Sequence, residues 1–138
     1  MTTTEYEELI NDTRLFYRLP KRLFDDPAFE KMSIDAKVLY MILLDRRCLS
    51  EINGSNWRDD HGCVFIYFTI EDMMSLLNCG NKKVNELLKE LENNNLVQRK
   101  HRGLGRPNRI YVYDLLSPHN PNWKPGGKMI EGGNEKYA

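Results

Sequence analysis

Residues 69–95 read TIEDMMSLLNCGNKKVNELLKELENNN, and this stretch predicts two short amphipathic helices joined by a tight turn. Apolar residues recur at i, i+3, i+4 and i+7 in each half: Ile70, Met73, Met74 and Leu77, then Val84, Leu87, Leu88 and Leu91. Thr69 has the chemistry of an N-cap, with Asp72 three positions later as in a capping box. Cys79-Gly80 interrupts the helices, and the asparagines at 93–95 favour a helix end. The stretch therefore predicts a helix-turn-helix.

A β-hairpin with a basic tip is expected after the second helix. Strand-like residues 96–100 and 109–113 flank a loop that contains Gly103 and Gly105, which tolerate positive φ angles. The segment 96–110 has no acidic residue and five basic ones: Arg99, Lys100, Arg102, Arg106 and Arg109. Alternate side chains of a strand face opposite ways, so Arg99 and Arg109 could instead pack against the sheet. A hairpin in this position is the wing of a winged helix-turn-helix.

The sequence before residue 69 predicts a core helix and one more strand. Ser33 is a suitable N-cap for a helix that we expect to end near Cys48, and its apolar residues cover most of its circumference. Residues 50–62 are expected to form a loop with a tight turn at 60–62, and residues 64–68 (VFIYF) a strand. The predicted fold class is α+β, a winged helix-turn-helix with core helices and a small antiparallel sheet.

Three regions follow from the composition. Residues 1–13 are polar and predict a flexible arm, residues 14–116 the winged-helix domain, and the Pro- and Gly-rich residues 117–138 a flexible linker or tail. We expect that linker to lead to a further C-terminal domain absent from this sequence. An apolar segment at the start of the domain is a candidate dimer contact, or else packs into its own core: Leu15, Phe16, Tyr17 and Leu19.

The charges are unevenly distributed along the chain. The 138 residues contain 20 basic and 20 acidic side chains, but residues 1–80 have a net charge of −5 and residues 81–110 a net charge of +5. Such a cluster favours a surface that binds a polyanion, although a solvated basic edge would look the same in sequence. A hydrophobic content of 41% excludes collagen-like classes and disorder over most of the length.

The second helix of the motif carries Lys, Asn and Glu opposite its apolar stripe, and these side chains suit the base edges of a DNA major groove. The alternative is a solvated helix face with Glu86 and Lys89 as an i, i+3 pair. The predicted DNA-binding residues are Thr69, Asn81, Lys82, Lys83, Asn85, Glu86, Lys89, Lys100, Arg102, Gly103, Arg106 and Asn108.

Other chemistry finds little support in the sequence. No apolar run approaches the roughly 18 residues that a membrane span needs. The three cysteines are widely spaced and the histidines scattered, which argues against zinc and a disulfide framework and favours a reducing cytoplasm. No segment supplies a nucleophile, a base and a stabilising group together, so we expect no enzyme, cofactor or metal.

Seven motifs occur in one order: RLPKRLF (18–24), AKVLY (36–40), LDR (44–46), IYFT (66–69), LNC (77–79), LKEL (88–91) and GLGRPN (103–108). Over about residues 14–113, the sequence closely resembles the N-terminal domain of the replication initiator protein A (RepA_N) family of plasmids and mobile elements of Gram-positive bacteria. The resemblance implies a winged-helix domain that binds repeated sites in a replication origin, usually as a dimer. It also implies a C-terminal domain that contacts host replication proteins.

The chain departs from the family pattern at three positions. Gly80 stands where a Ser cap is expected, and Arg102 and Arg106 stand where Gln and Lys are expected. These changes keep or raise the positive charge, so site preference would change more than affinity. A transcriptional repressor on the same fold and a winged-helix protein-interaction module remain alternatives.

Overall fold

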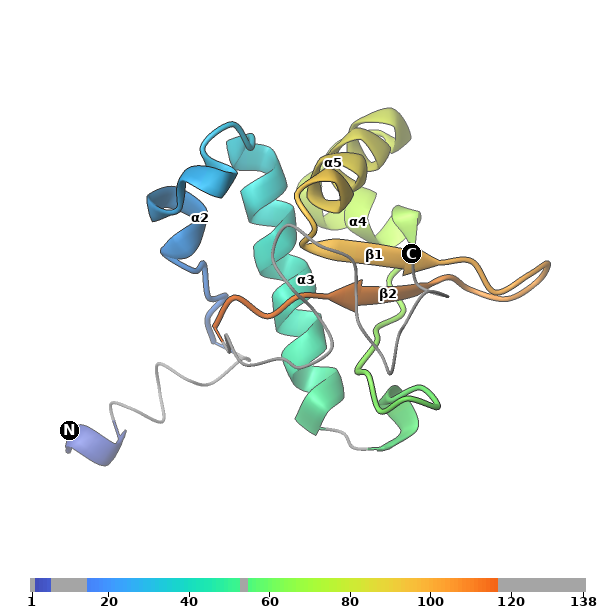
Figure 1. The fold of residues 1–138 in the computed structure, drawn as a ribbon, viewed down its shortest axis with the longest axis horizontal. Helices are drawn as coiled ribbons and strands as arrows, with labels where there is room; N and C mark the ends of the chain where they lie inside the picture. The colour runs from blue at the N-terminus through green and yellow to red at the C-terminus, as the bar shows by residue number, and fades with distance from the viewer. Residues whose placement is uncertain (1, 6–14, 53–54, 117–138) are drawn as a thin grey trace.

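The computed structural model describes residues 2–5, 15–52 and 55–116, and Figure 1 shows their arrangement. In chain order the elements are α2 (Arg22–Asp25), the 3-10 helix η1 (Pro27–Phe29), α3 (Ile34–Ile52), the 3-10 helix η2 (Ser55–Trp57), α4 (Ile70–Leu77), α5 (Asn81–Asn93), β1 (Val97–Lys100) and β2 (Arg109–Val112). Most of the predicted N-terminal arm and the whole predicted linker at 117–138 lie outside the described residues.

The central helix α3 begins at the predicted cap. The Ser33 hydroxyl accepts a hydrogen bond from the Ala36 amide at 3.1 Å, and Ala36, Leu39 and Leu43 are completely buried. The prediction that this helix ends near Cys48 was wrong, because α3 continues to Ile52. No Gly or Pro interrupts the segment before residue 53, and buried Ser50 lies within the added turn.

The helix-turn-helix is confirmed. The Thr69 hydroxyl accepts a hydrogen bond from the Asp72 amide at 3.0 Å, and α4 ends at Asn78, whose φ of 54° is left-handed. Gly80 caps α5 in an extended conformation without a side-chain hydrogen bond. The four apolar residues predicted for the inner face of α5 are all buried: Val84, Leu87, Leu88 and Leu91.

The sheet has two antiparallel strands, with Val97 opposite Val112 and Lys100 opposite Arg109. The prediction of a regular strand at residues 64–68 was wrong. This segment makes only two isolated β-bridges, Arg58–Val64 and Ile66–Ile110. The Ile66 amide and carbonyl each bond to Ile110 at 2.9 Å, and two residues later the chain turns into the cap of α4. That turn leaves no room for a longer ladder.

The wing loop, residues 101–108, projects away from the helices (Figure 1). Gly103 and Gly105 have φ angles of +101° and +78°, as predicted, and the Arg106 amide donates to the Gly103 carbonyl at 3.3 Å. The His101 Nδ1 and Asn108 Oδ1 lie 2.9 Å apart across the base of the loop. A helix-turn-helix followed by this hairpin is a winged helix, so the predicted fold class is confirmed.

Candidate nucleic-acid interface

The outer face of α5 carries most of the predicted contact residues. Asn81, Lys82, Glu86 and Lys89 are exposed. Among the described residues, neither Lys82 nor Lys89 has an ion-pair partner. The predicted alternative, a Glu86–Lys89 pair, is therefore not formed. This face presents two uncompensated ammonium groups to a ligand.

Two of the predicted α5 residues already have partners. The Lys83 ammonium lies 3.0 Å from Oδ2 of Asp35 in the first turn of α3, and this carboxylate raises the pKa of Lys83. Asn85 donates to the carbonyl and the side-chain oxygen of Asn81 at 2.9 and 2.8 Å. Both side chains are therefore already engaged in contacts within the protein.

The charge of the hairpin is smaller than its composition indicates. Arg99 donates to Glu92 of α5 from Nη2 at 2.7 Å and from Nε at 3.2 Å. The guanidinium of Arg109 stacks over the Phe65 ring, with 4.2 Å between Cζ and the ring centroid. The expectation that these two arginines can pack inward is confirmed, because they fasten the hairpin to α5 and to the segment before α4.

Tyr67 joins the wing loop to the segment before α4. The Nη1 of Arg102 donates to the Tyr67 hydroxyl at 3.4 Å. Burial opposes ionisation of this phenol, yet hydrogen bonds from Arg109 and Arg102 and their positive charges together lower its pKa below 10.0. The Tyr67 ring also packs edge-on against Trp57 and Phe65, with centroid separations of 5.9 and 5.3 Å. The base of the wing therefore rests on an aromatic cluster.

A cleft of about 280 Å³ lies where α4, α5 and the hairpin meet. It is lined by residues of all three parts, including the predicted contact residues Thr69, Asn85 and Asn108. Arg99 and Pro107 contribute to the same wall. Residues that are almost forty positions apart in sequence are thus brought to one surface.

The remaining predicted residues lie on the hairpin. Gly103 and Arg106 are exposed on the wing loop, and Lys100 is half-buried opposite Arg109 in β2. Within the described part of the chain, Arg106 has no ion-pair partner. Arg106 therefore adds a cation on the wing loop that, like Lys82 and Lys89 on α5, has no carboxylate partner among the described residues.

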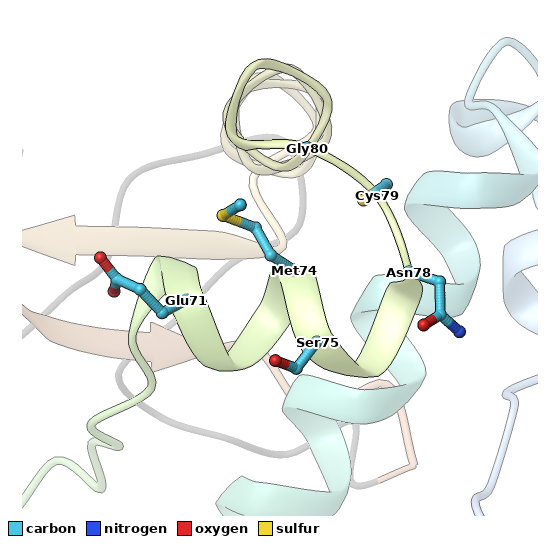
Figure 2. A pocket seen from close by; sticks show the side chains of 6 residues that line it. All are labelled: Glu71, Met74, Ser75, Asn78, Cys79 and Gly80. Atoms are coloured by element: carbon cyan, nitrogen blue, oxygen red, sulfur yellow. The ribbon is translucent and has the colours of Figure 1, made fainter.

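A second depression lies on the helix-turn-helix itself. Figure 2 shows Glu71, Met74, Ser75 and Asn78 along α4, with Cys79 and Gly80 in the turn. Its volume is about 750 Å³, and none of these six lining residues is basic. This hollow therefore does not extend the cationic surface.

The predicted dimer segment is exposed. Leu15, Phe16, Tyr17 and Leu19 have exposed fractions of 56%, 48%, 49% and 39%, so within the described chain they are not packed into the core. Phe24 of α2 is 55% exposed as well. These four residues thus form an exposed apolar surface at the start of the domain, and their role as a dimer contact stays a prediction.

Sequence reasoning did not single out Tyr67 or Leu104 as site residues, whereas it assigned Asp59 to a turn. Tyr111 donates to Asp59 at 2.8 Å, and Asp59 also accepts the amides of His61 and Cys63, which builds the predicted turn at 60–62. The arginine partners of Tyr67 are remote in sequence, so no spacing rule could identify this residue. Leu104 is fully exposed between two glycines, a signal that was visible in the sequence.

The described residues show neither a metal site nor a membrane span. They contain no group of three or more His, Cys, Asp or Glu side chains placed to hold a metal ion. No helix among them is long and apolar enough to cross a membrane.

Comparisons with known proteins agree with this fold. Residues 15–124 match the family model described as replication initiator protein A (RepA) N-terminus. The "41 kDa protein" of Lactobacillus helveticus is 29% identical over 114 residues, which are 83% of this chain and 32% of that protein. The chain therefore spans about a third of the length of this curated relative.

Solved structures are similar as well. One described as "N-Terminal domain of DNA binding protein" has a TM-score of 0.65 and 33% identity, and "Structure of Rep-DNA complex" has 0.64 and 33%. "Structure of MDR initiator" has 0.60 and 38%. Each comparison covers 83% of this chain and 82%, 82% and 84% of the respective structure.

Proposed function

The chain belongs to the replication initiator protein A N-terminus (RepA_N) family, and we propose that residues 15–116 are the duplex-DNA-binding domain of a replication initiator. The family match confirms the resemblance that the sequence motifs indicated. One similar structure is described as a Rep–DNA complex, which supports DNA as the ligand class of this chain too.

The cleft between α5 and the hairpin is the observation that carries the proposal. It brings Thr69, Asn85 and Asn108 to one wall, and the cations without carboxylate partners stand on the elements that form it. Origin DNA is a polyanion, and a surface that neutralises its phosphates gains affinity because the bound counterions are released. The polar groups in the cleft would then distinguish bases or hold the register.

In this proposal α5 lies in the major groove. Its first turns carry Lys82 and Asn85, and the N-terminal part of a recognition helix usually contacts the base edges. Asn85 pairs with adenine after releasing Asn81, while Glu86 accepts from cytosine N4. Lys89 and Arg106 contact phosphates on either side of the cleft.

A dimer on repeated origin sites is the second part of the proposal. The exposed apolar residues 15–19 supply the contact between copies, which would place two α5 helices one or more turns apart on the duplex. The domain itself catalyses nothing and takes no cofactor. A domain outside this chain would make the contacts with host replication proteins. The protein would act in the cytoplasm.

A direct binding assay tests the proposal. The 138-residue chain is used to select duplexes from a randomised pool, and the recovered duplex and a scrambled copy are titrated by fluorescence anisotropy between 50 and 200 mM salt. We expect tighter binding to the recovered duplex and an affinity that falls steeply with salt. Binding that is absent or independent of salt would favour the protein-interaction module instead. Recovered sites that map to a promoter rather than to origin repeats would favour a repressor.

A further inference from the structure

Leu104 occupies the tip of the wing loop. It is the most exposed large apolar side chain in the described part of the chain. An isolated exposed leucine is common on protein surfaces, but this one lies between the two glycines of the wing loop. That loop projects away from the helices (Figure 1).

Two glycines in a tight turn flank Leu104. Gly103 and Gly105 both have positive φ angles, and a Cβ built on either glycine would meet no atom within 4 Å. The Arg106 amide closes the turn on the Gly103 carbonyl at 3.3 Å. Open space therefore flanks the leucine on both sides, and the tip presents a single apolar side chain.

The residues beside this tip are cationic. Arg102 precedes Gly103 and is held by Tyr67, while Arg106 follows Gly105 and has no carboxylate partner among the described residues. A tip that binds an apolar groove of a protein does not need a guanidinium group on each side. A tip that enters a nucleic-acid groove does need these two charges, because phosphates line both edges of the groove.

We propose that Leu104 inserts as a wedge between two adjacent base pairs from the minor groove and kinks the duplex. This inference rests on the proposed function and adds a specificity-determining contact to it. The minor groove is about 6 Å wide, so only a slim loop can enter it without opening the groove first. Apolar side chains that enter this way unstack a base step, while flanking cations hold the backbone. Pyrimidine–purine steps unstack most easily, so the preferred step is TA or CA/TG.

The test uses the 138-residue chain and the duplex recovered by selection, labelled at its two ends for energy transfer. A second copy carries 2-aminopurine at the step nearest the wing, located by footprinting. Wild-type protein, Leu104→Ala, Leu104→Met and Arg106→Ala are compared for affinity, bend and 2-aminopurine fluorescence. Thermal unfolding of each variant shows whether the fold is intact, and we expect no change because the side chain is fully exposed.

We expect wild-type binding to raise both end-to-end energy transfer and 2-aminopurine fluorescence. Leu104→Ala should lose both signals and about tenfold in affinity, with an unchanged salt slope, because no charge is removed. Leu104→Met should keep them, because its side chain has a similar volume. Arg106→Ala should instead reduce the salt slope by about one unit.

Two results would overturn the wedge. One is a Leu104→Ala variant that bends and unstacks the duplex as the wild type does. The other is a change in the sedimentation of the DNA-free Leu104→Ala protein, which would make the tip a protein contact. Failure of the wild type to recover any duplex would refute the proposed function as well, and it is seen before any variant is compared.

Discussion

Arg102 of the wing loop donates a hydrogen bond to the hydroxyl of Tyr67 at 3.4 Å, which ties the wing to the segment just before α4. The same phenol interacts with Arg109, whose guanidinium stacks on Phe65. One tyrosine thus contacts arginines from both sides of the hairpin. This contact therefore adds to those of Arg99 and Arg109, which also hold the hairpin against the rest of the domain.

Replacing Tyr67 with Phe should loosen the wing without unfolding the domain. The ring and its aromatic neighbours stay, while the hydroxyl that orients both arginines is lost. We expect duplex affinity to fall about threefold to tenfold, in line with the roughly 0.5–1.5 kcal/mol of one hydrogen bond. Anisotropy titrations measure this loss, with Tyr137→Phe, outside the described residues and outside the proposed contacts, as the matched control. Equal affinity of both variants would contradict the anchoring role.

The same phenol gives a prediction about pH. The two guanidinium groups lower the pKa of Tyr67 in the folded protein, so its ionised form is favoured there. Because the folded pKa lies below the unfolded one, the wild type should gain stability relative to Tyr67→Phe as pH rises through the folded pKa. Absorbance titration of the tyrosinate band should show one phenol that ionises at lower pH than an ordinary tyrosine, and Tyr67→Phe should lack it. Identical titration curves would show that the arginines do not act on this group.

Salt dependence should separate the free cations from the paired ones. Lys89→Ala and Arg106→Ala should each lower the slope of log affinity against log salt by about one unit, because each removes one of the proposed phosphate contacts. Arg99→Ala should change the slope much less, since Glu92 already holds that guanidinium at 2.7 Å. Titrations at four salt concentrations give the three slopes. An equal decrease for all three variants would place Arg99 on the DNA surface.

The exposed N-terminal segment predicts a dimer. Phe16 is 48% exposed among other apolar side chains, and an aspartate there should abolish self-association. Size-exclusion chromatography with light scattering should give a dimer for the wild type and a monomer for Phe16→Asp. The control is Ile52→Asp at the far end of α3, where the side chain is 74% exposed. A monomeric wild type at all concentrations would exclude this contact.

Local patterns in the sequence were enough to predict the helix-turn-helix and the hairpin. Helix and turn rules act between residues that are within about four positions of each other. This range covers the cap at Thr69, the apolar stripe of α5 and the two wing glycines. The length of α3 and the loss of a regular strand at 64–68 depend on packing and on where the chain must turn next. Those features are set by contacts between remote segments.

The candidate site divides in the same way. Periodicity correctly placed Lys82 and Lys89 on an exposed face of α5. It could not reveal that Lys83 pairs with Asp35, because the two residues lie on different helices and far apart in sequence. A count of charges likewise overstated the basic hairpin, since Glu92 of α5 compensates Arg99. Composition counts charges, but only the fold shows which of them are compensated.

The position of α5 against α3 provides the last prediction. The Glu90 carboxylate accepts hydrogen bonds from the Ser33 amide and hydroxyl, so a residue of the proposed recognition helix also caps the core helix. Glu90→Ala removes both bonds and leaves a part-buried amide without its partner, which should cost about 1–3 kcal/mol of unfolding free energy. Glu86→Ala, one turn earlier on the exposed face, should stay within about 0.5 kcal/mol of the wild type. Urea unfolding followed by circular dichroism measures both, and equal stability of the two variants would mean that the capping contact does not position α5.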